Sequence, residues 1–409
     1  MVFTTLAHLM DVELLREAYK RTNKQGSPGV DGVTAKEYAE NLEEKLAELH
    51  ERLRKKEYKA PPVKRTYLEK EDGSKRPIGK PAFEDKIVQR AVAMLVGAVY
   101  EQDFYDSSYG FRPGRSPHNA LREVRDKCVL ENINWIVDAD VSGFFDSIPK
   151  GKLQEVIRQR VNDGGIVRLI GKWLNAGVLE GEEMIYPETG TPQGGVISPL
   201  LANIFLHEVL DKWFEQEVKP RMRGQSYLVR FADDFIIGCE LESDARRIIE
   251  VLPKRFGRYG LTIHPTKTKM VKFGRPKGKE DGKGNSTFDF LGFTHYWTRT
   301  RKGNWVVKRK TSAKRFRRAG KRIWEWCRRN RHESIFEQHW QLSLKLRGHY
   351  QYYGIRGNYE SLAAYYEYVK RAWRKWLGSR GGKKRMTVKR FFELLEVLKL
   401  PKPRIVHSI

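Results

Sequence analysis

The segment 227–239 constrains this chain most, because it consists of two short apolar runs with a pair of adjacent acids between them. The runs 228–231 and 235–237 are rich in aromatic and β-branched residues, which predicts two β-strands. Asp233 and Asp234 fall where a tight hairpin turn is expected, and Asp suits turns because its side chain can bond the local backbone. Two neighbouring carboxylates repel unless a cation or a proton lies between them. Taken alone, the pair is an ordinary Asp-rich turn, so a functional role depends on the rest of the chain.

The charge of the chain is large and unevenly distributed. The 409 residues carry a formal net charge of +27, and 40% of them are hydrophobic, which is enough for sizeable cores. Residues 301–409 hold 30 Lys and Arg against 7 Asp and Glu, so most of the excess lies in the last quarter of the chain. Such a balance implies a polyanionic partner, and nucleic acid fits better than an anionic membrane. The alternative is a solubilising basic tail, but aromatic residues are interleaved with the charge.

Cysteine usage and hydropathy indicate the compartment. The chain has three cysteines, Cys128, Cys239 and Cys327, far apart and without a C-x-x-C pair, which argues against a zinc site and excludes a disulfide framework. The N-terminus lacks the pattern of a signal peptide. No run of about 18 apolar residues is present, so no membrane span is predicted. We expect a cytoplasmic, bacterial-type, nucleoid-associated protein.

The order of predicted elements favours an α+β fold. Strands and helices do not alternate regularly, as they would in a parallel α/β sheet. The pattern predicts helices over about 5–22, 34–56, 83–100, 198–218 and 243–259, a hairpin over 63–79, a strand over 135–141, and a basic, helical region after residue 300.

A third acid suggests chemistry for the pair in the hairpin. Asp140 ends the apolar strand 135–141, two residues after Asp138. A cluster of carboxylate oxygens is what Mg²⁺ requires. Two such ions about 3.5–4 Å apart can hold the attacking and leaving oxygens of an in-line phosphoryl transfer. In a polymerase the attacking group would be a primer 3′-hydroxyl and the leaving group pyrophosphate.

The motifs around these acids resemble one family, the group II intron-encoded reverse transcriptases/maturases. The ordered set is specific and covers nearly the whole chain, although each motif alone is weak. The matching segments are Arg76-Pro-Ile-Gly-Lys-Pro81, Ser108-Tyr-Gly-Phe-Arg-Pro-Gly-Arg-Ser116, Asp140-Val-Ser-Gly-Phe-Phe-Asp146, Thr191-Pro-Gln-Gly-Gly-Val-Ile-Ser-Pro-Leu200, Phe231-Ala-Asp-Asp234, 260–269, Phe290-Leu-Gly-Phe293 and Leu346-Arg-Gly-His-Tyr-Gln-Tyr-Tyr-Gly354.

The resemblance implies a catalytic metal site and a nucleotide site. Asp140, Asp233 and Asp234 would be catalytic and, with the Val141 carbonyl, would bind two Mg²⁺ ions, for which Mn²⁺ can substitute. The residues implied in nucleotide binding are Lys70, Arg76, Phe145, Gln193, Gly194 and Lys267.

The nucleotide residues have distinct implied roles, each with an alternative. Lys70 and Arg76 would hold the triphosphate, or would be ordinary surface cations of a hairpin. The ring of Phe145 would exclude a 2′-hydroxyl, or would be a core residue beside Phe144. Lys267 would offer a proton to pyrophosphate, and a plain surface lysine is almost as good an interpretation.

The resemblance further implies contacts with template and primer at Arg112, Arg115, Phe231 and Arg347. A structural ion pair is the alternative for Arg112 and Arg115. Phe231 stands where many relatives have Tyr, and the loss of one hydroxyl beside the primer end should be tolerated. For most aromatic residues in 305–380, the core of a small helical domain is the main alternative to base stacking.

The implied architecture is a right-hand polymerase. Residues 1–130 would form an N-terminal extension and fingers, 131–300 an antiparallel palm (with parts of the fingers from about residue 60), and 301–409 a basic helical thumb that binds RNA. No Cys-pair/His endonuclease signature follows the maturase segment.

The implied function is RNA-directed DNA synthesis from dNTPs on an RNA template with a DNA or RNA primer. Binding of structured intron RNA to promote splicing and retrotransposition would accompany it. Two alternatives stay open: a reverse transcriptase domesticated for host defence or DNA repair, and a non-catalytic splicing maturase that only binds RNA. All three predicted metal-binding acids are present, which argues against the second alternative.

Overall fold

The computed structural model describes residues 1–69, 75–190, 194–276, 286–380 and 386–409, and Lys70 and Gln193 lie outside these ranges. The described residues form two compact units. Unit 1 comprises 1–116, 137–237 and 243–270, and unit 2 comprises 117–136, 238–242 and 271–409. The predicted division into fingers, palm and thumb stays a prediction. No helix in the described ranges is both long and apolar enough to cross a membrane.

Unit 1 holds most of the helices that precede residue 260. They are η1 (Ala7–Leu9), α1 (Val12–Arg21), α2 (Ala35–Ala39), α3 (Leu42–Arg54), α4 (Phe83–Tyr100), α6 (Phe144–Ser147), α7 (Lys150–Arg158), α8 (Gly164–Asn175), α9 (Ser198–Leu206) and α10 (Glu242–Arg258, of which Glu242 belongs to unit 2). The prediction for 83–100 is confirmed as α4, whose buried face includes Ile87, Val88 and Val92.

Three predicted helices of unit 1 are interrupted in the structure. The helix predicted over 5–22 is divided into η1 and α1, because Asp11 between them has an extended backbone. The helix predicted over 34–56 is split between α2 and α3 because Asn41 adopts a left-handed backbone, with φ of 59°. The helix predicted over 198–218 widens after α9 into two π-helical turns, η2 (His207–Asp211) and η3 (Phe214–Val218), before the short η4 (Lys219–Arg221). Periodicity alone does not reveal such widening, because a π-turn inserts one residue into the helical repeat.

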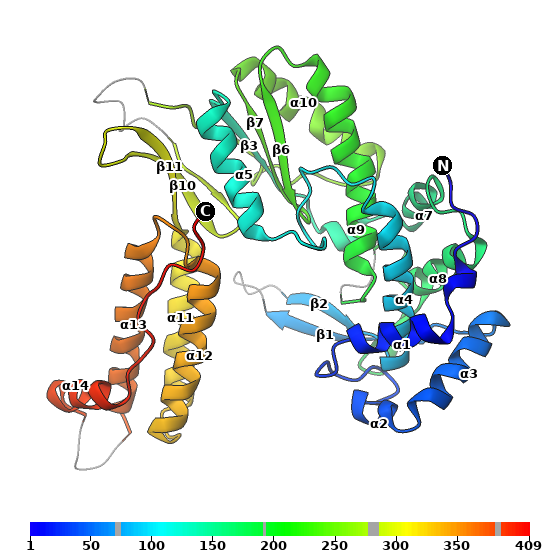
Figure 1. Cartoon of the computed structure of the whole chain (residues 1–409), viewed down its shortest axis with the longest axis horizontal. Coiled ribbons are helices and arrows are strands. Elements are labelled where there is room, and N and C mark those ends of the chain that lie inside the picture. The colour runs from blue at the N-terminus through cyan, green and yellow to red at the C-terminus, as the bar shows by residue number, and fades with distance from the viewer. Residues whose placement is uncertain (70–74, 191–193, 277–285, 381–385) are drawn as a thin grey trace. The chain divides into compact units, whose positions relative to one another are not determined.

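Two sheets organise unit 1 (Figure 1). One has the order β2-β1-β4-β5 and is formed by β1 (Val63–Glu69), β2 (Lys75–Lys80), β4 (Val178–Glu180) and β5 (Glu183–Ile185). Strands β1 and β2 are antiparallel, with Leu68 opposite Arg76, which confirms the hairpin predicted over 63–79 for the residues described.

The second sheet carries the predicted acids. Its order is β6-β7-β3-β8, formed by β6 (Ser226–Phe231), β7 (Asp234–Cys239), β3 (Trp135–Ala139) and β8 (Lys269–Lys272), and most of its residues belong to unit 1. The predicted hairpin over 227–239 is confirmed, and β7 already begins at Asp234. Strands β6 and β7 are buried over most of their length, with Val229 and Ile236 completely buried, and Arg230 is the charged residue inside this apolar run.

Unit 2 combines a small sheet with a helical bundle. Strands β9 (Phe288–Phe290), β10 (Phe293–Arg299) and β11 (Trp305–Thr311) form an antiparallel sheet in the order β11-β10-β9. The prediction of helix directly after residue 300 is therefore wrong for β11. The alternation of Val307, Arg309 and Thr311, all buried, with outward-facing residues is a strand pattern that the high charge obscured.

The helices of unit 2 are α5 (Pro117–Leu130), α11 (Ala313–Arg329), α12 (Ile335–Tyr353), α13 (Tyr359–Leu377) and α14 (Val388–Val397). Figure 1 shows α11, α12 and α13 side by side. Tyr350, Tyr365 and Trp373 are buried in their common core, as the alternative to base stacking anticipated, whereas Trp324 and Trp340 are exposed.

Candidate polymerase site

The turn between β6 and β7 brings Asp233 close to Asp140. Asp233 is half-buried, and its burial, followed by the negative charge of Asp140, raises the pKa of its carboxyl. The cations Arg76 and Arg230 act in the opposite direction on the same group. Asp234 is exposed at the first position of β7. The structure therefore brings two of the predicted acids and the predicted cation Arg76 into one electrostatic neighbourhood.

Asp140 is held by the backbone that follows it. Its carbonyl accepts a hydrogen bond from the His264 backbone N–H at 2.7 Å, and Val141 pairs with Ile263 in an antiparallel bridge. The same pairing brings Lys267 to the acid, because its Nζ lies 3.0 Å from Oδ2 of Asp140. Sequence reasoning had placed Lys267 beside pyrophosphate, and its ammonium here neutralises a predicted metal ligand.

The donor chemistry at this point fits a divalent cation. Within the described ranges no group of three or more His, Cys, Asp or Glu side chains converges tightly enough to hold a metal ion by itself. The charge of Asp140 nevertheless raises the pKa of Asp233, so the two carboxylates repel each other. A cation bound between them would remove this repulsion. Carboxylate and carbonyl oxygens are also the ligands that Mg²⁺ prefers.

A buried arginine holds the turn between β6 and β7 by hydrogen bonds. Arg230 is completely buried, and its guanidinium donates to Oδ1 and Oδ2 of Asp211 at 2.7 and 2.5 Å. The same group donates to Oδ1 of Asn203 and to the carbonyl of Ala232, both at 3.0 Å, and to Oγ of Ser108 at 2.7 Å. Every side of the guanidinium is therefore satisfied, and one of its hydrogen bonds ends on the backbone of the turn itself.

The loop 107–115 completes this support. The backbone N–H of Tyr109 donates to the carbonyl of Arg230, and the N–H of Arg230 donates to the carbonyl of Ser107, each at 2.8 Å. Gly110 lies so close to the turn that a Cβ there would be 2.2 Å from the backbone nitrogen of Ala232. Only glycine fits this approach, which explains the Tyr-Gly-Phe sequence of the motif.

Sequence analysis missed the role of Arg230. A signal was present, because a cation inside an otherwise apolar strand must find a partner when the strand is buried. It also missed Phe111, which is 60% exposed and whose ring lies 6.5 Å from that of Phe231. This pair of rings borders the turn, where the primer end was expected.

The predicted template contacts fall in different environments. Arg112 is buried, lies 3.0 Å from Glu101 and donates to the carbonyls of Tyr105 and Ser108. This is the structural ion pair expected as the alternative. Arg115 is half-buried and pairs with Asp106. Arg347 belongs to unit 2 and is exposed on α12.

Of the described residues predicted to bind the nucleotide, Arg76 belongs to β2, Phe145 belongs to α6, and Gly194 lies against β2. Phe144 is buried while Phe145 is only half-buried, so the core position belongs to Phe144 and the Phe145 ring reaches the surface. Gly194 has φ of +109°, and a Cβ there would lie 2.3 Å from the Gly79 carbonyl of β2. Gly194 therefore packs directly on β2.

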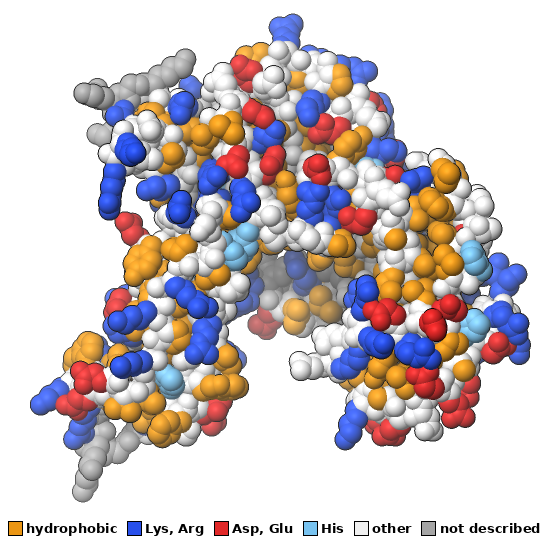
Figure 2. Space-filling view, in the orientation of Figure 1, with side chains coloured by type: hydrophobic (Ala, Val, Ile, Leu, Met, Phe, Trp, Pro, Cys, Tyr) orange, Lys and Arg blue, Asp and Glu red, His pale blue; other side chains and the backbone are white. Residues whose placement is uncertain are grey.

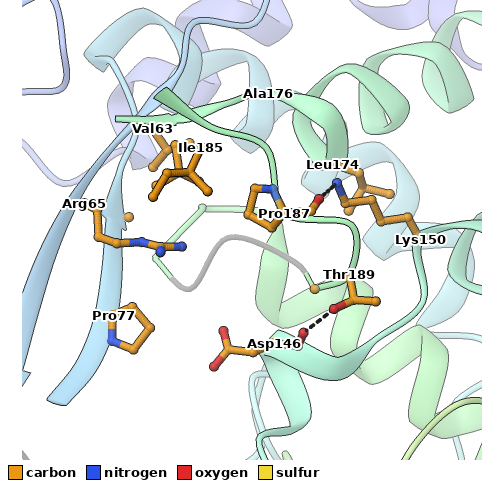
Figure 3. Close-up of a pocket in the computed structure, with 13 residues that line it drawn as sticks. Val63, Arg65, Pro77, Asp146, Lys150, Leu174, Ala176, Ile185, Pro187 and Thr189 are labelled. Carbon is orange, nitrogen blue, oxygen red and sulfur yellow. Dashed lines mark hydrogen bonds between the residues drawn. The ribbon is translucent and has the colours of Figure 1, made fainter. Parts of the chain in front are cut away.

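A cavity of about 330 Å³ opens beside these elements (Figure 3). Its walls carry Arg65, Asp146 and Lys150, together with Gly79 and Gly190. Figure 3 shows Lys150 bonded to the carbonyl of Pro187, and Thr189 donating to the carbonyl of Asp146 at 2.9 Å. Among the described lining residues none is a predicted metal-binding acid, and Asp146 of α6 and Pro77 and Gly79 of β2 form part of the walls.

Comparison with known proteins defines the class. Residues 68–295 match the family described as Reverse transcriptase (RNA-dependent DNA polymerase), and this match includes all three acids and Lys267.

Individual relatives narrow the class further. The chain is 34% identical over 258 residues to Protein YkfC of Escherichia coli, covering 55% of this chain and 67% of that protein. It is 33% identical over 287 residues to the Group II intron-encoded protein LtrA of Lactococcus lactis, covering 67% of this chain and 47% of LtrA. It is 29% identical over 181 residues to Nuclear intron maturase 2, mitochondrial, of Arabidopsis thaliana, covering 34% of this chain and 24% of that protein. The chain belongs to the group II intron reverse transcriptase/maturase family, and it spans about half of the length of LtrA.

Proposed function

We propose that this chain is an RNA-directed DNA polymerase that adds deoxynucleotides to a primer 3′ end on an RNA template. The observation that carries the proposal is the approach of Asp140 to the Asp233–Asp234 turn, with Arg76 and Lys267 beside it. Group II intron RNA would be a further ligand, through which the protein promotes splicing and mobility. Family membership and the basic residues after 300 support this second role.

In this proposal the chain's residues divide the work of one phosphoryl transfer. Asp140, Asp233, Asp234 and the Val141 carbonyl would hold two Mg²⁺ ions, which supply charge stabilisation for the attacking and leaving oxygens. Arg76 reaches the same neighbourhood from β2, so its positive charge can hold the triphosphate and offset charge that develops in the transition state.

Other residues set selectivity and proton transfer. The half-buried Phe145 ring would crowd a ribose 2′-hydroxyl, which favours deoxynucleotides. Lys267 would exchange its contact with Asp140 for one with the departing pyrophosphate once cations neutralise the acid, and would then donate a proton to it. Phe231, paired with Phe111, would pack against the primer terminus.

Primer extension tests the proposal. The full chain, an RNA template, a DNA primer, dNTPs and Mg²⁺ should yield extended product, and Asp233→Asn and Asp234→Asn should each abolish it. Both variants should keep the wild-type melting temperature and RNA affinity, because they change neither a core contact nor the basic surface. Wild-type protein that binds RNA but extends no primer on several templates would instead favour the non-catalytic maturase.

A further inference from the structure

Unit 2 contains a groove whose described lining residues include none of the residues of the candidate site. It has a volume of about 650 Å³ and lies along α11, with residues of α12 and α13 completing its walls. Its size is within the range of about 300–1,000 Å³ that is typical of small-ligand pockets. Figure 2 shows Lys and Arg side chains spread over the helical bundle of this unit.

The rim of the groove is cationic. It is formed by Arg315, Arg318, Arg322 and Arg329 of α11 and by Lys345 of α12. The four arginines are spaced by three, four and seven residues, which places them along one face of the helix. Among the described lining residues Glu325 is the only acid, and it lies 4.0 Å from Lys321. Among the described lining residues the groove therefore has five cations against one acid.

The floor of the groove is aromatic and uncharged. The ring of His349 stacks on Tyr365 with centroids 3.8 Å apart and an angle of 21°, and it lies 4.7 Å from Tyr353. Burial lowers the pKa of His349 to about 4, so the imidazole is neutral at physiological pH. Trp326 and Ile323 line the same space. His349 and Tyr365 are therefore packed against each other, and the half-buried Trp326 is the ring on which a base can stack, in place of the Lys345 ammonium that lies 5.2 Å from its centre.

We propose that this groove binds one unpaired nucleotide of a nucleic acid, with its base on the aromatic floor and its flanking phosphates on the arginine rim. Cations bind the phosphate backbone and release counterions. Aromatic side chains stack on bases that are free of a partner. A base inside a duplex is already paired and stacked, so its faces are not available to an aromatic side chain of the groove. Single-stranded or bulged segments are therefore the ligands, and intact duplex is not.

This inference uses the nucleic-acid binding of the proposed function but not its polymerase activity. The test is accordingly a binding experiment without dNTPs or Mg²⁺, in which failure of catalysis has no effect. The probe is a short RNA single strand with a central 2-aminopurine, whose fluorescence falls when the base stacks on an aromatic ring. DNA of the same sequence and an RNA duplex form the other arms.

The chain offers a matched control for charge. Arg322→Ala with Arg329→Ala removes two rim cations, whereas Arg317→Ala with Arg328→Ala removes two exposed cations of the same helix that do not line the groove. We expect the rim pair to weaken single-strand binding at least tenfold and to abolish the quenching. Removal of these two arginines should also lower the slope of log affinity against log salt concentration by about 1.4, since each phosphate contact contributes about 0.7 on single strands. The control pair should change affinity about twofold and keep the quenching.

A second variant tests the floor. Trp326→Leu should reduce the quenching more than the affinity, and the melting temperature would show whether the bundle still folds. Tighter binding of RNA than of DNA would add a 2′-hydroxyl contact to the site, and equal binding would assign it to base and phosphate alone. Equal weakening by the two arginine pairs, or a duplex that binds as tightly as the single strand, would overturn the proposal.

Discussion

Replacement of Asp211 by Asn tests whether the buried arginine network holds the acid-bearing turn. Asp211 and Arg230 both have fully buried side chains, and the pair is joined by two hydrogen bonds. Asparagine keeps the volume of the aspartate and one acceptor oxygen, but it removes the counter-charge. The guanidinium would then be buried among neutral partners alone, which are the new amide oxygen, Asn203, Ser108 and the Ala232 carbonyl.

The expected loss follows from the burial of the charge. Removing one partner of a buried ion pair typically destabilises a protein by about 3–5 kcal/mol, because an uncompensated charge remains inside. The three remaining hydrogen bonds of Arg230 stabilise its charge in part, so we expect the lower end, about 3 kcal/mol. A domain with about 5–15 kcal/mol of stability would still fold, but with a smaller margin.

The measurement is urea unfolding followed by far-UV circular dichroism, at pH 7 and at lower pH. Burial alone would raise the pKa of Asp211, but the charge of Arg230 and its hydrogen bonds to the carboxylate, together with the nearby imidazole of His207, outweigh it, so the pKa is lowered. A carboxyl with a lowered folded-state pKa stabilises the protein above its unfolded pKa of about 3.9 and loses that contribution as the pH falls. Wild type should therefore lose stability on acidification more steeply than Asp211→Asn.

A double variant separates charge from packing. Asp211→Leu with Arg230→Met replaces the pair by apolar side chains, a change that is often neutral or stabilising in buried ion pairs. It should recover at least half of the stability that Asp211→Asn loses, while primer extension stays impaired because the hydrogen bond to the Ala232 carbonyl is gone. A loss below about 1 kcal/mol in Asp211→Asn, or full polymerase activity in the double variant, would refute the reasoning.

Three further predictions concern single contacts. Gly110→Ala puts a Cβ 2.2 Å from the Ala232 backbone nitrogen, so overpacking should cost about 1–3 kcal/mol in urea unfolding and slow single-nucleotide incorporation. Burial raises the pKa of Asp85 to about 6, so the protonated carboxyl stabilises the folded state below pH 4, and this stability is lost as the pH rises to 6. The wild-type free energy of unfolding should therefore fall by about 3 kcal/mol between pH 4 and pH 6, and Asp85→Asn should show no such fall. Lys267→Ala should slow incorporation at least tenfold, whereas unfolding should change by less than about 1 kcal/mol because its ion pair with Asp140 is exposed; an unchanged rate would favour the plain surface lysine.

Local patterns predicted the elements that position the acids. The hairpin 227–239 follows from a run of β-formers on either side of two turn residues, and both signals are short-range. Helix α4 follows from the apolar spacing between residues 83 and 100. Asp140 at the end of β3 was visible because an acid directly after a buried strand stands out.

The rest depends on contacts between distant parts of the chain. The hydrogen bond of Arg230 to Ser108 joins residues 122 positions apart. The ion-pair partner of Arg230, Asp211, lies in a π-helical turn that periodicity does not reveal. The strand β11 was mistaken for helix because its lysines and arginines hid the alternation of buried residues. The groove on α11 requires three helices at once, so no local pattern contains it.

The buried network explains how an unfavourable turn persists beside the acids. Ala232 adopts φ of 57°, a left-handed backbone that costs a non-glycine residue about 1–2 kcal/mol. Glycine would relieve that cost, yet its freedom would also let the turn sample other conformations. The carbonyl of Ala232 is bonded to Arg230, and its nitrogen is packed against Gly110, so the surrounding residues impose the conformation. In this way the strand, the loop 107–115 and η2 together fix the direction in which Asp233 leaves the turn.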